Sequence, residues 1–435
     1  MGYKEACAHL EALGVDAMKH MSPSLERIEA ICTALDHPER GIPAIHITGT
    51  NGKTSTARIA TSLLAAAGLN VGTYTSPHLG SVNERIAFNG ASISDDEFGE
   101  VFDHIQPYLE VVEGNLGERL SYFEVLTAMF FLWATEKPVD VLVVEVGLGG
   151  RWDATNVILA PVAVITNIAL DHTALLGTDR ATIAREKSGI IKPGAQVITG
   201  ELSPDALGVI TEEAEAVEAN VSVIQRDFGA TENTLAIGGR YLTLFTSNGT
   251  YDEMFLPLHG DHQGDNAAMA LEAVTRFLPS RAFEEALVAE GLATATVDGR
   301  LETVRLASGS EAAVVLDVAH NPEGMSALVS SLIEAFPFER VLVVVGILED
   351  KDHAGMLTEL ARLNAHLVVT KARSSRSVGP SELARAAEAL GLTTEVIEDV
   401  GAAVSRAIAI AQPGDLVCVT GSHYVVGEAR SVLRR

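Results

Sequence analysis

Short apolar segments alternate with longer helical segments along most of the chain. The stretch up to about residue 40 is expected to be helical, with an apolar face made of Leu25, Ile28, Ile31, Cys32 and Leu35. The β-rich runs that follow it are 43–48, 70–75, 139–146, 161–167 and 195–199. Helical segments separate these runs. This alternation is typical of a parallel sheet that helices cover on both faces.

The pattern changes between about 222 and 258, where β-rich runs follow one another directly. Turn dipeptides separate them, Gly238-Gly239 and Asn248-Gly249. The runs themselves are Thr234–Ile237, Tyr241–Phe245 and Glu253–Leu256. This predicts an antiparallel meander appended to the first domain, followed by a helix over about 264–277.

A second alternating series begins after residue 297, since residues 290–298 show no strong period. We therefore expect one domain at 1–297 and another at 298–435. The β-rich runs of the second series are 312–317, 340–345, 366–370, 393–397 and 415–420. The predicted fold class is α/β with two doubly wound domains, the larger one N-terminal and the smaller one Rossmann-like and C-terminal.

Charge and composition narrow the kind of protein. With 435 residues and a net charge of -27, the chain lacks the basic face that nucleic acids and anionic membranes require. Its apolar runs are too short to span a bilayer, and Met1 to Leu13 does not have the pattern of a signal peptide. Its three cysteines are far apart and read as reduced, buried residues. We expect a soluble cytoplasmic protein.

The strongest motif follows the run at 43–48, where Gly49-Thr50-Asn51-Gly52-Lys53-Thr54-Ser55 leads into a helical pattern. Backbone N–H groups and the helix dipole at such a turn favour phosphate. Lys53 can supply a point charge and Thr54 a hydroxyl ligand for Mg²⁺. The loop departs from the usual Gly-x-x-x-x-Gly-Lys-Thr spacing, which would require glycine where this chain has Ile47. The alternative to a phosphate site is a plain glycine turn before a helix, with a surface lysine. In so acidic a chain, a nucleotide site has to be locally cationic.

Polar residues collect where the other predicted strands of the first domain end. One of these strands ends with Glu145, and two others are followed by Ser76 and His172. Parallel strands bring their carboxyl ends to one edge of the sheet. Oxygen ligands beside nucleotide phosphates indicate Mg²⁺. Taken singly, Ser76 could cap a helix, Glu145 could be a lone core carboxylate and His172 a structural histidine. Lys187 lies after a predicted helix, where a lysine is usually solvated.

The second domain repeats this arrangement. Polar stretches follow its strands at 317–322, 346–352, 370–371 and 420–424. Each alone is most simply a turn rich in small polar residues. Two sheets that both present polar strand ends indicate a cleft between the domains, in which one domain holds nucleotide and the other closes over it.

Taken together, the ordered motifs resemble the bacterial folylpolyglutamate synthase / dihydrofolate synthase family of the Mur ligase superfamily, over essentially the whole chain. Beside the loop at 49–55, the motifs are Ser76-Pro77-His78, Asn83-Glu84-Arg85-Ile86, Phe123-Glu124, 145–150, 153–156, Leu170-Asp171-His172, 186–192, His262-Gln263 with Asn266, 299–302, 317–322, Asp350-Lys351-Asp352 and Thr420-Gly421-Ser422. The N-terminal domain is then of the P-loop ATPase type.

The resemblance implies an ATP-dependent amide ligase that joins the amino group of L-glutamate to dihydropteroate, to reduced folates or to both. The carboxylate would first take the γ-phosphoryl group of ATP to give an acyl phosphate, and the glutamate amine would then displace phosphate. Such chemistry depends on positioning and charge stabilisation. The expected cofactors are ATP and Mg²⁺ at two sites, and the expected assembly is a monomer.

The resemblance also implies roles for individual residues. Lys53, Lys187, His172 and Arg300 would be catalytic, with Lys187 matching a lysine that the family carbamylates. The other roles are nucleotide contacts by the loop at Gly49, Thr50, Asn51, Gly52, Lys53, Thr54 and Ser55 and by Asn266, Arg300 and Asp317; metal ligands Thr54, Ser76, Glu145 and His172; a glutamate side at His320 and Ser422; and a pterin side at Phe123 and Asp153. His423 departs from the family, which often has leucine there, and Asp298 stands where proline is common.

Three alternatives stay open. Another Mur-type ligase would act on a UDP-linked peptidoglycan precursor, but it usually carries an extra N-terminal domain, and only about 42 residues precede the β-rich run that leads into the loop here. A P-loop NTPase acting as a switch or motor would show the full loop spacing and no second domain with polar strand ends. A non-catalytic nucleotide-binding protein would leave Glu145 and His172 unexplained.

Overall fold

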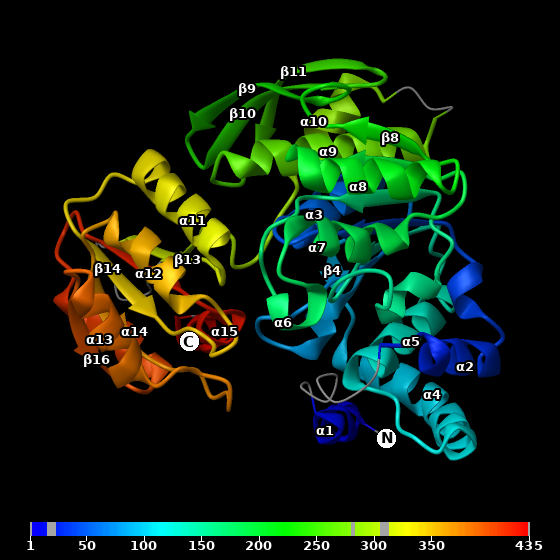
Figure 1. The fold of residues 1–435 in the computed structure, drawn as a ribbon, viewed down its shortest axis with the longest axis horizontal. Coiled ribbons are helices and arrows are strands. Elements are labelled where there is room, and N and C mark those ends of the chain that lie inside the picture. Colours follow the sequence, from blue (N-terminus) through cyan, green and yellow to red (C-terminus); the bar gives the residue numbers. More distant parts are fainter. Residues whose placement is uncertain (1, 15–22, 280–282, 305–312, 434–435) are drawn as a thin grey trace.

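The N-terminal sheet confirms every β-rich run predicted in the first series. The structure is a computed structural model that describes residues 2–14, 23–279, 283–304 and 313–433. Eight strands lie in the order β4-β3-β2-β5-β1-β6-β7-β8 (Figure 1). They are β1 (Ala44–Thr48), β2 (Val71–Tyr74), β3 (Ile86–Phe88), β4 (Ala91–Ser92), β5 (Val141–Glu145), β6 (Val162–Ile165), β7 (Gln196–Thr199) and β8 (Asn220–Val223). The six strands from β2 to β8 in this order are parallel, and β3 and β4 pair antiparallel at one edge.

Helices cover both faces of this sheet, because alternate strand residues enter different cores. Ile45 and Val143 pack in the core formed with α3 and α9, whereas Leu142 and Val144 pack in the core formed with α5. The helices are α1 (Tyr3–Leu13), α2 (Glu26–Ala34), α3 (Lys53–Ala66), α4 (Asp95–Leu116), α5 (Tyr122–Thr135), α6 (Thr173–Leu176), α7 (Arg180–Lys187), α8 (Pro204–Glu215), α9 (His262–Phe277) and α10 (Glu285–Ala293), with 3-10 turns η2 (Pro38–Arg40), η3 (Val82–Arg85), η4 (Ala154–Val157) and η5 (Ser188–Ile190).

The N-terminal helical prediction is confirmed at α1 and α2, and residues 15–22 of that stretch lie outside the described residues. One prediction needs correction, because α10 extends into residues 290–298, where no helical period is visible. Cys32 and Cys418 are buried and Cys7 is partly buried, and all three are free thiols. In the described part of the chain, no helix combines the length and apolar character needed to cross a membrane.

The predicted meander is confirmed as a three-stranded antiparallel sheet in the order β11-β10-β9. Its strands are β9 (Gly229–Ala236), β10 (Gly239–Thr246) and β11 (Gly249–Leu256). Leu242 and Leu244 pack in the core shared with α9. On β10, the guanidinium of Arg240, only 1% exposed, donates to both carboxylate oxygens of Glu334, at 2.8 and 3.1 Å. The meander therefore also contacts the C-terminal domain.

The C-terminal sheet has six strands in the order β12-β13-β17-β14-β15-β16, and it confirms all five runs of the second series. The strands are β12 (Glu302–Val304), β13 (Ala313–Leu316), β14 (Val341–Val345), β15 (His366–Val369), β16 (Thr393–Val396) and β17 (Leu416–Thr420). All are parallel except β12, which pairs antiparallel with β13 at the edge. The helices are α11 (Pro322–Ala335), α12 (His353–Ala361), α13 (Pro380–Ala389), α14 (Val400–Ile410) and α15 (His423–Leu433).

This topology places the predicted polar residues on facing sides of the two domains. In Figure 1 the C-terminal domain, coloured yellow to red, lies beside the N-terminal domain, coloured blue to green. The ends of β1, β2 and β5 and of β13, β14 and β17 supply residues to one cavity between them. The chain is thus an α/β protein with two sheet-containing domains, and the domain limit at residue 297 remains our prediction.

Candidate active site between the two domains

A cavity of about 530 Å³ lies between the domains and collects most of the predicted site residues. Those that line it are Thr50, Asn51, Gly52, Lys53, Thr54, Ser55, Ser76, Glu145, His172, Asn266, Arg300, Asp317, His320 and Ser422. Gly49 and Lys187 line a smaller cavity of about 40 Å³ that shares Lys53 and His172 with the large one. Phe123 and Asp153 line neither cavity. The two domains thus build one site together.

The loop between β1 and α3 has the geometry of an anion site. Gly49 has a φ of 148°, and a Cβ there would lie 1.8 Å from Oγ1 of Thr166, so the turn requires glycine. Gly52, with a φ of 82°, precedes α3 and supplies no side-chain cap. The first N–H groups of α3 therefore have no intrahelical acceptor and can bind an anion.

Lys53 folds back over this loop. Its Nζ donates to the carbonyl oxygens of Gly49, at 3.0 Å, and Thr50, at 3.1 Å. Burial lowers the pKa of Lys53, while the nearby Glu145 and Asp171 carboxylates act in the opposite direction. The ammonium is thus held where the outer phosphates of a nucleotide would meet it.

Glu145 lies at the centre of the predicted metal site. Oγ1 of Thr54 donates to its carboxylate at 2.9 and 3.0 Å, and the backbone N–H of Ser76 donates at 3.2 Å. The side chain is almost fully buried, and burial raises the pKa of Glu145. Carboxylate and hydroxyl oxygens are the ligands that Mg²⁺ prefers, so Thr54 and Glu145 fit a magnesium site.

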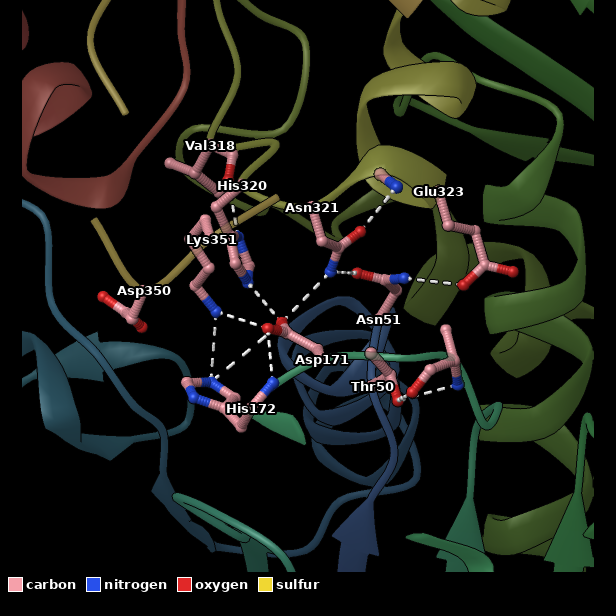
Figure 2. A network of polar contacts seen from close by, with 12 residues as sticks. Thr50, Asn51, Asp171, His172, Val318, His320, Asn321, Glu323, Asp350 and Lys351 are labelled. Atoms are coloured by element: carbon pink, nitrogen blue, oxygen red, sulfur yellow. Dashed lines mark hydrogen bonds and ion pairs between the residues drawn. The ribbon is translucent and has the colours of Figure 1, made fainter. Parts of the chain in front are cut away.

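His172 has a different partner from the one its predicted role requires. Its Nε2 lies 3.2 Å from Nζ of Lys351, which belongs to the C-terminal domain, and Lys351 also donates to Asp171 at 2.6 Å (Figure 2). Burial and the Lys351 charge lower the pKa of His172 to about 4. Over the described ranges, no three His, Cys, Asp or Glu side chains gather in a way that could hold a metal ion. The ligand role of His172 therefore stays a prediction.

Lys187 is the last residue of α7 and is not solvated, so the prediction of a solvated lysine after the helix is wrong. It is 4% exposed, and its Nζ donates to the carbonyl oxygen of Gly49 at 2.8 Å. Burial, together with the charge of Lys53, lowers the pKa of Lys187 to about 7. Lys187 thus holds the phosphate loop through the carbonyl of Gly49. Near pH 7, a large fraction of the protein molecules carries this side chain as a neutral amine.

The predicted nucleotide contacts outside the loop come from both domains. Burial lowers the pKa of Arg300, and the carboxylates of Asp317 and Glu145 act against this. Asp317 accepts backbone N–H groups of Leu301, at 3.0 Å, and Ala319, at 2.9 Å. Asn266, on α9, packs directly against the phosphate loop, because a Cβ at Gly52 would lie 2.4 Å from its Oδ1.

His320 and Ser422, predicted on the glutamate side, lie on the same wall of the cavity. The carbonyl of Val318 accepts from Nδ1 of His320 at 2.9 Å, and the ring centroids of His320 and His423 are 5.1 Å apart. Burial lowers the pKa of both histidines, that of His320 to about 4. Oγ of Ser422 accepts the N–H of Val425 at 3.2 Å, in the first turn of α15.

The two residues predicted on the pterin side are engaged with the protein itself. Asp153 accepts the N–H groups of Leu148, at 2.9 Å, and Thr155, at 3.0 Å. The ring of Phe123 packs against the backbone of Gly147, where a Cβ would lie 2.6 Å from it. Their contact with a pterin stays a prediction.

Other residues that line the cavity lie outside the predicted site set, among them two basic residues and two tyrosines. Lys351 and Arg85 are part of the quoted motifs, Asp350-Lys351-Asp352 and Asn83-Glu84-Arg85-Ile86, but they have no role in the prediction. A basic residue shortly after a buried strand is the signal that could have identified Lys351, whereas Arg85 stands directly before β3 and has no such signal. Tyr122 and Tyr424 also line the cavity, and no spacing in the sequence distinguishes them from other surface or core aromatics.

Comparison with known proteins agrees with this geometry. Residues 47–274 match the Mur ligase middle domain, and residues 299–423 match the glutamate ligase domain of Mur ligases. A dihydrofolate synthase/folylpolyglutamate synthase of Mycobacterium tuberculosis is 39% identical, with 95% of this chain and 91% of that protein covered. The structure of Mycobacterium tuberculosis folylpolyglutamate synthase complexed with ADP has a TM-score of 0.91 at 39% identity, with 95% of each chain covered. Escherichia coli FolC in complex with DHPP and ADP has a TM-score of 0.87 at 31% identity, with 100% of this chain and 98% of that chain covered.

These relatives confirm the resemblance drawn from the motifs. They are named for folate synthesis and polyglutamylation, so a ligase that acts on a UDP-linked precursor is not favoured. The middle-domain match covers residues 47–274, about half of the chain, and the 39% identical relative matches nearly all of it. The chain therefore belongs to the Mur ligase family and, within it, to the dihydrofolate synthase/folylpolyglutamate synthases, ATP-dependent ligases that add L-glutamate to dihydropteroate, to folates or to both.

Proposed function

We propose that the chain joins L-glutamate both to dihydropteroate and to reduced folates in the cavity between its domains. One observation carries the proposal: a single cavity has a phosphate loop with a buried carboxylate on one wall, and ring side chains with an arginine on another. A relative of 39% identity is named for both activities. Both acceptors carry a ring system and a carboxylate, which this combination of walls suits.

The reaction has two steps. A carboxylate oxygen of the acceptor attacks the γ-phosphorus of ATP, and the bond from that phosphorus to the bridging oxygen breaks. The products of this step are ADP and an acyl phosphate of the acceptor. The amine of L-glutamate then attacks the carbonyl carbon, the bond to phosphate breaks, and the nitrogen gives up a proton. Catalysis here consists of positioning and of stabilising charge.

The nucleotide side consists of residues from both domains. The N–H groups at the start of α3 and the ammonium of Lys53 bind the phosphates. Asn266 and Asp317 contact the rest of the nucleotide, and Arg300 offsets charge that develops during phosphoryl transfer. This places phosphoryl transfer at the wall formed by the loop and Glu145.

Magnesium belongs to the same wall in our proposal. Thr54 would hold one ion, and Ser76, Glu145 and His172 would hold a second, with His172 available once Lys351 leaves its Nε2. When bound, Mg²⁺ supplies positive charge that balances the phosphate oxygens. The support is the set of hydroxyl and carboxylate oxygens around Glu145.

Lys187 is proposed to be carbamylated. Its neutral amine would add to CO₂, forming a bond from Nζ to carbon and losing one proton, so that a cation becomes a carboxylate. The support is a buried amine with a pKa of about 7, beside a small cavity. The product would place extra oxygen atoms near the phosphate loop.

The remaining roles complete the proposal. His320 and Ser422 contact the incoming L-glutamate, while Phe123 and Asp153 contact the pterin of the acceptor. The protein acts as a cytoplasmic monomer on small molecules, without nucleic acid or membrane partners. The support for the first of these roles is that His320 and Ser422 lie on one wall of the cavity.

The experiment is glutamate-dependent ADP release in the presence of Mg²⁺. Dihydropteroate and a reduced folate monoglutamate are supplied separately. Turnover with both acceptors is the expected result. Turnover with one acceptor would restrict the function to that activity, and release with neither, from protein that binds ATP, would overturn the proposal.

A further inference from the structure

Arg85 differs from the other buried arginines of the described residues. Three of these have a carboxylate partner: Arg27 with Glu124 at 3.0 Å, Arg240 with Glu334 at 2.8 Å and Arg430 with Asp298 at 2.6 Å. Arg85 is only 6% exposed, and within the described ranges its one side-chain hydrogen bond runs from Nε to Nδ1 of His78, at 3.0 Å. A buried guanidinium without an anion is costly, so Arg85 is suited to an anionic ligand.

The surroundings of Arg85 show where that ligand would lie. The guanidinium lies 5.4 Å from the centroid of the Tyr122 ring, and both side chains line the large cavity together with His78 and Tyr424. Nδ1 of His78 accepts the bond from Nε of Arg85, so this bond uses only one of the three guanidinium nitrogens. The terminal nitrogens of Arg85 are therefore available to a carboxylate that lies next to rings.

Arg85 is separate from the cations of the nucleotide wall. Lys53 donates to the carbonyl oxygens of Gly49 and Thr50 in the phosphate loop, whereas the guanidinium of Arg85 lies beside His78 and Tyr122. The phosphates of ATP thus have their own cations. L-Glutamate has no ring, so the ring-bearing acceptor is the substrate that fits this corner of the cavity.

The two acceptors differ in one respect that bears on Arg85. Dihydropteroate has a single carboxylate, the reacting one, and it has to reach the phosphate loop. A folate that already carries glutamate has a second carboxylate, on the α-carbon, that does not react. We propose that Arg85 binds this non-reacting α-carboxylate and thereby determines the use of glutamylated acceptors. The inference rests on the function proposed above and assigns a specificity residue to it.

Steady-state kinetics of Arg85→Met test the inference. Loss of a charge-assisted hydrogen bond should raise KM for a reduced folate monoglutamate about 10- to 100-fold. KM values for dihydropteroate, L-glutamate and ATP should stay close to those of the wild type. Arg85→Lys should lie between, because an ammonium keeps the charge but not the fork of donors. Arg406→Met, which removes an exposed arginine paired with Glu395, is the matched control.

A second measurement needs no variant. A reduced folate whose α-carboxylate is converted to the amide should show the same rise in KM with the wild-type enzyme, and Arg85→Met should add little to it. If Arg85 had a merely structural role, its loss would raise KM for dihydropteroate and for the folate alike. If Arg85 bound L-glutamate, its loss would raise KM for L-glutamate with both acceptors. Either result would overturn the inference. A wild type that uses neither acceptor would instead overturn the proposed function, and this inference with it.

Discussion

Lys351 of the C-terminal domain donates to the carboxylate of Asp171 in the N-terminal domain at 2.6 Å (Figure 2). Both side chains are largely withdrawn from water. Burial opposes the ionised form of Asp171, but Lys351, His172 and His320 together hold the pKa of that carboxyl below its usual range. The same ammonium reaches Nε2 of His172. One charge of the C-terminal domain therefore connects the two walls of the cavity.

Lys351→Met should weaken the closure of the two domains and lower turnover by roughly 10-fold or more, since removing one partner of a buried charge pair leaves Asp171 uncompensated. Turnover and small-angle X-ray scattering with ADP bound are the measurements, and the radius of gyration should increase. Lys371→Met removes an exposed lysine paired with Glu398 at 3.1 Å and is the control. Scattering and turnover equal to the wild type would show that the pair does not hold the domains.

Glu145→Gln should leave the protein folded and reduce Mg²⁺-dependent turnover by roughly 100-fold or more, because the site loses the negative charge that a divalent cation requires. The pKa of Glu145 is raised in the folded state, so the stability that this group contributes is fully present below its ordinary pKa and is lost as the pH rises through the higher folded value. Without ligands at neutral pH, the thermal midpoint of the glutamine variant should thus equal or exceed that of the wild type.

The control for Glu145→Gln is Glu272→Gln, which neutralises a fully buried carboxylate of α9 that pairs with Arg276 at 2.6 Å. This variant should lower the thermal midpoint and keep Mg²⁺-dependent turnover. Near-normal turnover of Glu145→Gln at saturating Mg²⁺ would remove Glu145 from the metal site.

The sequence predicts the parts of the fold that depend on local pattern. The runs around Ile45 and Val143 are predicted as strands because nearly every position is apolar, and Glu145 is identified because a carboxylate ends such a run. Strands β3, β4 and β12 escape prediction, since each has only two or three residues, too few to show a period, and the four-residue edge strand β8 escapes prediction as well. Local pattern thus locates the phosphate loop and the strand ends around it.

Contacts between distant residues leave no such pattern. Lys187 meets Gly49, 138 residues away, and Lys351 meets Asp171, 180 residues away. Neither the burial of Lys187 nor the pairing of Lys351 follows from the residues beside them. That Arg85 has no carboxylate partner among the described residues depends likewise on how the whole fold places its acidic side chains. Charge pairing between domains therefore had to come from the structure.

Lys187→Met should reduce the pH dependence of folding stability that the wild type shows. The amine has a pKa of about 7 in the folded protein and an ordinary value of 10.5. Between these values the unfolded chain binds a proton that the folded protein lacks, so stability rises with pH from about 7 upward. This group adds at most about 1.4 kcal/mol per pH unit to the slope.

Urea unfolding at pH 7, 8 and 9 in CO₂-free buffer compares Lys187→Met with the wild type. The slope of stability against pH should be smaller in the variant, and exposed Lys371→Met should keep the wild-type slope. Bicarbonate should flatten the wild-type slope, because a carbamylated nitrogen no longer takes up the proton, and ¹³C-labelled bicarbonate should give a carbamate signal that Lys187→Met lacks. Equal slopes for all three proteins in CO₂-free buffer would mean that the Lys187 amine is charged when folded, and the basis for its carbamylation would then be lost.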